Sequence, residues 1–322
     1  MAASDYITRI GPDPVGHCAL GLGCWSFGGT QWGGQEDADS IAAMEAALSL
    51  GITHFDTAFG YGGGRSEGLI GELLKGGRRD SVYLATKFFP GQLTAQYALD
   101  QLEGSLQRLQ TDCVDLYYIH WPNTGKDLRP LMEGLEQARA QGKLKAIGVS
   151  NFNCEQMAEL SEAGRIDVHQ LCYNAFWRYP ERDVIPYCVE NGISVVTYSS
   201  MARGLLTGKL PREPQFKEGD DRGSMVYFDA DVWPHVYEGV EQLKGLAAEA
   251  GRPLAQLAIL WVMKQPGIAC ALVGARNEQQ MRENAAALEG TVAEEVFTRM
   301  SAIADEVMTH IPDTGNIFRF YP

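Results

Sequence analysis

The chain has 322 residues, of which 45% are hydrophobic and 21% charged, and this ordinary globular composition excludes a disordered or low-complexity protein. Acidic residues number 41 against 27 basic ones, so the formal net charge of −14 argues against nucleic acid or a membrane surface as the main partner. Seven scattered cysteines without a C-x-x-C pair argue against a zinc ribbon or a disulfide scaffold, and no signal peptide or membrane-spanning stretch is evident, so we expect a cytoplasmic protein.

Eight short apolar runs predict strands along the whole chain. They mostly do not alternate apolar with polar residues, which is typical of parallel strands buried on both faces. The predicted strands cover residues 18–23, 52–57, 81–87, 114–121, 146–151, 168–174, 194–199 and 269–275. Amphipathic patterns predict helices at residues 40–51, 66–74, 99–110, 128–142, 153–163, 181–191, 238–264, 278–288 and 292–308.

The repeated strand-then-helix units predict an α/β protein, a (β/α)₈ TIM barrel formed as a single domain by residues 1–322. A doubly wound open sheet is the alternative. A G-x-G-x-x-G turn would favour that sheet, but the nearest match, GYGGGR, has Arg65 at the last glycine position. The segment at 211–233 is long, polar and weakly patterned, so it is either a lid over cofactor or substrate, with Arg222 as a phosphate contact, or an ordinary surface insertion.

Polar side chains end several of the predicted strands. Asp56, Lys87 and His120 each stand at the end of an apolar run, and Tyr61 follows Asp56 by five residues in a glycine-rich loop. The carboxyl ends of barrel strands meet at one mouth, so these four side chains can converge there. Taken singly, each has an ordinary interpretation as a cap, a solvated charge or a packing residue.

Together, the four residue types suit proton transfer to an oxygen. A tyrosine hydroxyl has an unperturbed pKa of about 10, which a neighbouring ammonium lowers. Asp56 would keep Lys87 charged, and His120 can hydrogen-bond a carbonyl oxygen or relay a proton. Because no side chain supplies hydride to the carbon, the set implies a nicotinamide cofactor.

Ordered motifs along essentially the whole chain resemble the aldo-keto reductase family. The segment GITHFDTAFGYGGGRSEGLIG resembles the family signature, and it is followed by ATKF, YIHWP, GVSNF, YSSMARGLLTGKL and VGARNEQQMREN. The pattern is nearer to the bacterial and potassium-channel-β-subunit-like branch. The resemblance implies that Tyr61 is the general acid in reduction, that Lys87 and Asp56 lower its pKa, and that His120 orients the carbonyl.

The same resemblance implies a cofactor site for NADP(H). Ser150, Asn151 and Gln170 would bind the nicotinamide carboxamide, and Tyr198 would stack on the ring. Ser199, Met201, Gly204 and Leu205 would line the pyrophosphate, and Gly274, Ala275, Arg276, Gln280, Glu283 and Asn284 would hold the adenosine end. Arg276 lies between a strand and a helix, where it can bind a 2′-phosphate, so we expect NADP(H) with NAD(H) as the alternative. A surface arginine is the other interpretation.

Aromatic residues end or follow strands at the expected mouth. Trp25, Phe59, Phe88 and Trp121 are predicted to line the substrate pocket, where aromatic walls suit an apolar carbonyl or the face of a sugar ring. The sequence therefore predicts an NADP(H)-dependent oxidoreductase that transfers hydride between nicotinamide and the carbon of an aldehyde, ketone, alcohol or sugar.

Two other functions stay open. One is a nucleotide-sensing auxiliary subunit of the same family, with little or no turnover. The other is a metal-dependent barrel hydrolase or isomerase using Asp56 and His120, although no cluster of His, Asp and Glu has ligand spacing, and we expect no metal. The oligomeric state is left open.

Overall fold

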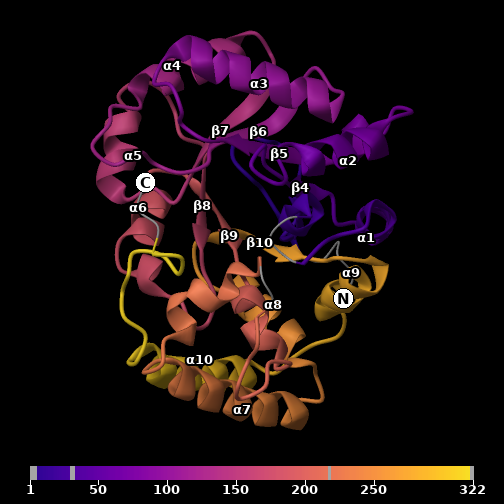
Figure 1. Cartoon of the computed structure of the whole chain (residues 1–322), viewed down its shortest axis with the longest axis vertical. Helices are drawn as coiled ribbons and strands as arrows, with labels where there is room; N and C mark the ends of the chain where they lie inside the picture. The colour runs from indigo at the N-terminus through magenta and orange to yellow at the C-terminus, as the bar shows by residue number, and fades with distance from the viewer. Residues whose placement is uncertain (1–5, 30–32, 217–218, 320–322) are drawn as a thin grey trace.

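The eight apolar runs form the parallel strands of a closed barrel in the computed structural model, which describes residues 6–29, 33–216 and 219–319 (Figure 1). Each strand pairs with the next along the chain, and pairing of the last strand with the first closes the barrel. The strands are β3 (Leu20–Gly23), β4 (His54–Asp56), β5 (Tyr83–Phe88), β6 (Val114–Ile119), β7 (Leu144–Ser150), β8 (Val168–Cys172), β9 (Ser194–Tyr198) and β10 (Ile268–Gly274). The predicted (β/α)₈ barrel is confirmed, and a doubly wound open sheet is excluded.

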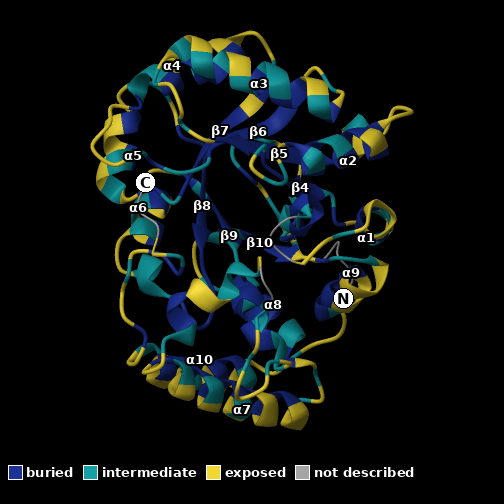
Figure 2. Cartoon of the chain, in the orientation of Figure 1, coloured by how far each residue is buried: buried dark blue, intermediate teal, exposed yellow. Residues whose placement is uncertain are grey.

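Helices surround the strands and turn their buried faces toward them (Figure 2). They are α1 (Asp37–Ser49), α2 (Arg65–Leu74), α3 (Ala95–Leu109), α4 (Arg129–Ala140), α5 (Cys154–Leu160), α6 (Val184–Glu190), α7 (Trp233–Glu249), α8 (Leu254–Met263), α9 (Glu278–Ala285) and α10 (Glu294–Met308). The continuous helix predicted over 238–264 is wrong, because two helices occupy it. Gly251 takes a left-handed φ of 63° and Pro253 cannot donate a backbone hydrogen bond, so the chain breaks between α7 and α8.

Two buried clusters show which strand residues face the barrel interior. Tyr83 and Ala85 belong to a small cluster with residues from the other strands, whereas Leu84 and Phe88 belong to the large core between strands and helices. Alternation along β5 therefore gives Lys87 the inward direction of Tyr83 and Ala85. A hairpin of β1 (Ile7–Thr8) and β2 (His17–Cys18) closes the amino end of the barrel, with Ile10 in the interior cluster.

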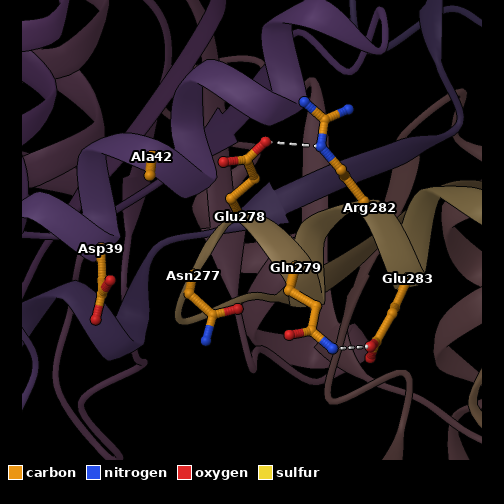
Figure 3. Close-up of a pocket in the computed structure, with 7 residues that line it drawn as sticks. All are labelled: Asp39, Ala42, Asn277, Glu278, Gln279, Arg282 and Glu283. Carbon is orange, nitrogen blue, oxygen red and sulfur yellow. Dashed lines mark hydrogen bonds and ion pairs between the residues drawn. The ribbon is translucent and has the colours of Figure 1, made fainter.

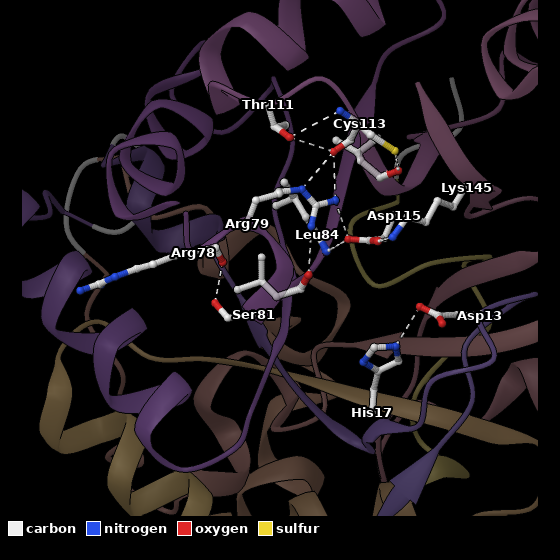
Figure 4. A network of polar contacts seen from close by, with 12 residues as sticks. Asp13, His17, Arg78, Arg79, Ser81, Leu84, Thr111, Cys113, Asp115 and Lys145 are labelled. Carbon is white, nitrogen blue, oxygen red and sulfur yellow. Dashed lines mark hydrogen bonds and ion pairs between the residues drawn. The ribbon is translucent and has the colours of Figure 1, made fainter. Parts of the chain in front are cut away.

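A network of charges also closes this amino end (Figure 4). Arg79 donates to the Asp115 carboxylate at 2.7 Å, the Leu84 amide donates to it at 2.8 Å, and Lys145 pairs with its other oxygen at 2.7 Å. Burial raises the pKa of Asp115, but these partners outweigh burial and the net pKa lies below its ordinary value. These charged side chains therefore neutralise one another. The active site of a barrel of this kind is expected at the opposite end, where the carboxyl ends of the strands lie.

Candidate active site

Glycines shape the loop that carries Tyr61 across the mouth. β4 ends at Asp56, and the chain folds back through residues 57–64 before α2 begins. A Cβ on Gly62 would lie 2.3 Å from the carbonyl oxygen of Gly28, and Gly62 has a φ of 68°. Two glycines therefore let this loop approach the turn η2 (Trp25–Gly28) closely, and the approach positions Tyr61.

A buried ion pair lies under the Tyr61 hydroxyl. The Lys87 Nζ donates to Asp56 Oδ1 at 2.5 Å and to the Thr57 carbonyl at 2.8 Å, and it lies 3.4 Å from the Tyr61 hydroxyl. The second carboxylate oxygen of Asp56 accepts from Gln170 Nε2 at 2.8 Å. Asp56 and Lys87 are both almost completely buried, so the ammonium is fixed in place beside the phenol.

The pKa values of this group differ from the sequence prediction. Burial raises the pKa of Tyr61, Lys87 lowers it and Asp56 raises it, so that the net pKa lies above its ordinary value. Burial lowers the pKa of Lys87, but Asp56 and Tyr61 together raise it further, and the net direction is upward. Of the two residues expected to lower the pKa of Tyr61, Lys87 does so and Asp56 does not. The net shifts keep Tyr61 protonated and Lys87 charged at neutral pH.

His120 lies beside Tyr61 as a neutral ring. Burial and the charge of Lys87 hold the pKa of His120 well below its ordinary value. Its ring lies edge-on to Tyr61, with centroids 5.8 Å apart, and stacks on Phe89 at 4.7 Å. The sequence analysis missed Phe89. It lies two residues after the inward-facing Lys87, so the alternation of side chains along a strand could have identified it.

The residues predicted for the carboxamide come together at the ends of β7, β8 and β9. Asn151 has a left-handed φ of 67°, and its amide donates to Ser150 Oγ at 2.9 Å and to the His120 carbonyl at 3.2 Å. Tyr198 donates its hydroxyl proton to Asn151 Oδ1 at 2.7 Å. Gln170 donates to Asp56, and its carbonyl accepts from the Asn151 backbone N–H at 3.0 Å, so hydrogen bonds connect the predicted carboxamide site to the ion pair.

The predicted pyrophosphate segment is a turn with unusual backbone geometry. Ser199, Ala202, Arg203 and Gly204 all have positive φ values, of 57°, 46°, 57° and 95°. The backbone N–H groups of Ala202 and Gly204 donate within this turn, to the carbonyls of Ser199 at 2.7 Å and Met201 at 3.0 Å, and so hold its shape. Met201 and Gly204 are partly exposed along this turn, whereas Leu205 is buried beneath it.

Arg276 extends from the end of β10 toward the 33–35 loop. Its Nε donates to Gln35 Oε1 at 3.0 Å, and its guanidinium also bonds to the Gly34 carbonyl. Its backbone N–H donates to Gln280 Oε1 at 2.9 Å, and Asn284 donates to the Gly274 carbonyl at 3.1 Å. Both partners of the Arg276 side chain are neutral, so its charge stays available to an anion.

The remaining residues predicted for the adenosine end lie around the start of α9. Ala275 is buried under the turn, whereas Gly274 is exposed, and a methyl group added there would meet nothing within 4 Å. Glu283 lines an open pocket of about 500 Å³ between α1 and α9, where it accepts from Gln279 at 2.8 Å (Figure 3). The Glu278–Arg282 ion pair lies in the same pocket, so these two charges neutralise each other.

Aromatic rings gather over the mouth. Trp25 stacks near Tyr61, with centroids 6.1 Å apart. Phe318, from the C-terminal segment, lies 6.1 Å from Trp25, 6.4 Å from Trp121 and 6.4 Å from Tyr198. The sequence analysis missed Phe318 because nothing local in the chain shows that its segment returns to the barrel mouth.

Two of the predicted pocket residues are not brought to this group. Phe88 is fully buried on the outer face of β5 and stacks on Tyr117 at 5.2 Å. Phe59 faces α3, where the guanidinium of Arg108 lies 4.5 Å from its ring centroid. The structure therefore assigns both rings to packing, and Phe89 and Phe318 stand at the mouth in their place.

The segment 211–233 is attached to the protein core, and its residues 217–218 lie outside the described residues. Met225, Val226 and Tyr227 are completely buried, and the Val226 amide donates to the Ile317 carbonyl at 3.2 Å. Asp221 pairs with Arg203 at 2.5 Å, and that guanidinium covers the Trp25 ring at 3.7 Å. The segment is thus built over the turn at 199–204, beside the mouth.

Two features are absent from the part of the chain that the structure describes. Within the described ranges, no helix is long and apolar enough to cross a membrane. In the same part of the chain, no three His, Cys, Asp or Glu side chains gather in a way that could hold a metal ion.

The sequence profile of the Aldo/keto reductase family matches residues 19–305. The chain is 38% identical to "Aldo-keto reductase YhdN" of Bacillus subtilis over 284 residues, which cover 85% of this chain and 86% of the relative. It is 30% identical over 319 residues to the "NADH-specific methylglyoxal reductase" of Escherichia coli, covering 92% and 97% of the two chains.

Solved structures give the same result. The glycerol dehydrogenase AKR11B4 of Gluconobacter oxydans has a TM-score of 0.84 and 29% identity, with 97% of this chain and 98% of that chain covered. An aldo-keto reductase of Klebsiella pneumoniae in complex with NADPH has a TM-score of 0.76 and 26% identity, with 98% and 99% covered. This chain is therefore an oxidoreductase that belongs to the aldo/keto reductase family.

Proposed function

We propose that this protein transfers hydride between NADP(H) and a carbonyl or alcohol carbon, with Tyr61 as the general acid in reduction and the general base in oxidation. The buried Lys87–Asp56 pair carries this proposal, because its ammonium lies 3.4 Å from the Tyr61 hydroxyl. Neutral His120 supports it, since its ring lies edge-on to the Tyr61 ring, with centroids 5.8 Å apart.

The bound cofactor supplies or accepts the hydride, and the residues of this chain handle the proton. Tyr61 is protonated at neutral pH and gives its proton to the carbonyl oxygen as that oxygen gains charge. Lys87 stabilises the tyrosinate that remains, and Asp56 keeps Lys87 in place. His120 is uncharged, so its ring can donate a hydrogen bond to the substrate oxygen without adding a second cation to the site.

The described residues fit a phosphorylated dinucleotide. The turn at 199–204 would lie along the pyrophosphate, because a Cβ placed on Gly204 would lie 3.7 Å from Arg222 Nη1 and a guanidinium therefore borders the turn. Arg276 offers a cation that no carboxylate among the described residues neutralises, which favours the 2′-phosphate of NADP(H). The NADPH complex of the Klebsiella pneumoniae relative supports this choice, and the NADH-specific Escherichia coli relative keeps NAD(H) as the alternative.

We propose a small carbonyl compound or polyol as the substrate, acted on in the cytoplasm. The aromatic mouth formed by Trp25, Phe89, Trp121 and Phe318 suits such molecules, and the names of two relatives mention methylglyoxal and glycerol. The segment 211–233 serves as the lid over the cofactor, because it lies on the pyrophosphate turn.

Substitution of Tyr61 with phenylalanine tests the proposal. Oxidation of NADPH is followed by absorbance with methylglyoxal as substrate, and reduction of NADP⁺ with glycerol. We expect Tyr61→Phe to lower kcat by about 10²- to 10⁴-fold, since it removes a general acid. Binding of NADPH, measured by fluorescence quenching, is expected to stay within about twofold of the wild type because the ring remains. Full activity in Tyr61→Phe would overturn the role of Tyr61.

A further inference from the structure

Gln35 holds Arg276 through both its backbone and its side chain. The Gln35 amide donates from Nε2 to the Arg276 carbonyl at 2.6 Å, and its Oε1 accepts from the Arg276 Nε at 3.0 Å. The two residues precede α1 and α9, which pack side by side (Figure 1). One side chain therefore fixes both the backbone and the guanidinium of the residue proposed to bind the 2′-phosphate.

Other contacts hold Gln35 itself in place. Arg65 donates to the Gln35 backbone carbonyl at 2.7 Å, and the same guanidinium pairs with Asp37. Gln35 Nε2 also donates to the hydroxyl of Ser40 at 3.1 Å, and Ser40 is completely buried in the first turn of α1. The backbone and the side chain of Gln35 are thus both attached to neighbouring elements, so Gln35 can hold Arg276 in one position.

The groups that hold the guanidinium of Arg276 are neutral. Gln35 Oε1 and the Gly34 carbonyl accept from it, whereas Asp37, two residues after Gln35, pairs with Arg65 instead. Among the described residues, these contacts use Nε and Nη2 of Arg276, and they leave the two N–H groups of Nη1 for a phosphate oxygen. Gln35 therefore orders the cation without neutralising its charge.

A side-chain amide suits this position for a chemical reason. The side chain has to donate to a carbonyl and accept from an N–H group at the same time, and an amide does both without carrying a charge. A carboxylate could accept but not donate, and its charge would neutralise the guanidinium. An arginine side chain that is already ordered loses less conformational freedom when it binds an anion, which improves affinity by about two- to tenfold.

We propose that Gln35 is a specificity-determining residue, which positions Arg276 and so sets the preference for NADP(H) over NAD(H). It acts through Arg276 and is therefore a positioning residue. The inference rests on the proposed function of Arg276 as the contact for the 2′-phosphate. Because the 2′-phosphate is the group that distinguishes the two nucleotides, loss of the Gln35 amide should change the affinity for NADPH and leave the affinity for NADH as it is.

Fluorescence titration of the full chain with NADPH and with NADH measures this preference. Gln35→Met keeps the length of the side chain but removes its hydrogen bonds to Arg276, and we expect it to weaken NADPH binding by about three- to tenfold. Gln35→Glu places a carboxylate beside the Arg276 Nε and should weaken NADPH binding by about tenfold or more. Gln107→Glu, the same change at an exposed position of α3, is the matched control and should bind both nucleotides as the wild type does.

A double variant shows whether Gln35 acts through Arg276. In the Arg276→Ala background, Gln35→Met should cause no further loss of NADPH affinity, because the side chain that Gln35 positions is absent. A further loss of about threefold or more would overturn the proposal, since Gln35 would then affect the nucleotide by another route. Thermal unfolding of each variant shows that it is folded before its affinities are compared.

The single variants separate failure of this inference from failure of the proposed function. If Arg276→Ala weakens NADPH binding while both Gln35 variants bind as the wild type does, the role of Gln35 is overturned and the 2′-phosphate contact stands. If Arg276→Ala leaves NADPH binding unchanged, the proposed 2′-phosphate contact fails, and the role of Gln35 fails with it. Equal losses for NADPH and NADH in Gln35→Met would also overturn the proposal, because a merely structural role affects both nucleotides.

Discussion

Replacement of Lys87 with methionine tests whether the buried ammonium drives proton transfer from Tyr61. The two polar atoms lie 3.4 Å apart. At an effective dielectric constant of about 20, an ammonium at that distance stabilises a tyrosinate oxygen by about 5 kcal/mol. Each 1.36 kcal/mol is a factor of ten in rate, so we expect Lys87→Met to lower kcat by about 10³- to 10⁴-fold.

The same replacement leaves the buried Asp56 carboxylate without its cation, although the Gln170 amide remains at 2.8 Å. We expect the free energy of unfolding to fall by about 3–5 kcal/mol, the usual effect of breaking a buried ion pair from one side. A second change, Asp56→Asn, removes the remaining charge. The double variant should therefore recover stability but not rate, which separates folding from catalysis.

Single-turnover oxidation of NADPH measures the chemical step, and chemical denaturation measures stability. The Asp56→Asn single variant is the matched control, because it keeps the ammonium beside Tyr61 and should lose less rate than Lys87→Met. A Lys87→Met enzyme within tenfold of the wild-type kcat, with normal cofactor affinity, would refute the electrostatic role of Lys87.

The described geometry supports three further predictions. Arg276→Ala should weaken NADPH binding by about 10- to 100-fold, the effect of one charge-assisted hydrogen bond, and leave NADH binding unchanged in fluorescence titrations; equal losses for both nucleotides would contradict the 2′-phosphate contact. Gly62→Ala, whose methyl group would lie 2.3 Å from a facing carbonyl, should lower both Tm and kcat more than Gly63→Ala, where nothing lies within 4 Å. Burial lowers the pKa of His54 and of His169 to about 3, so the unfolded chain binds more protons than the folded chain below pH ~6.5. The free energy of unfolding should therefore fall as the pH is lowered from about 7 to about 4. A Tm independent of pH over that range would contradict this prediction.

The fold was largely predictable because each barrel strand is a short apolar run that must be buried on both faces. The eight predicted strands are all present, and their ends move by only a few residues. The missed helix break carried a local signal, since Gly251 and Pro253 stand two residues apart. The amphipathic pattern on both sides outweighed that signal in the sequence analysis.

The site was predictable where strand ends determine position, and less so where packing does. Asp56, Lys87 and His120 occupy strand ends, which converge in any barrel. Phe89 was missed in favour of Phe88 because the alternation was not followed past the end of β5. Phe318 reaches the mouth only through tertiary packing of a distant segment, and the upward pKa of Tyr61 depends on a burial that no local pattern reveals.

The hairpin and the C-terminal segment lie at opposite ends of the barrel axis. Ile10 lies within the amino end, whereas Phe318 lies over the mouth and Arg319 pairs with Asp229 next to it. An affinity tag or surface tether placed ahead of the hairpin would leave the mouth facing the solution. An attachment that continues directly from Arg319 would begin beside the opening, so coupling on the side of the hairpin keeps the mouth accessible.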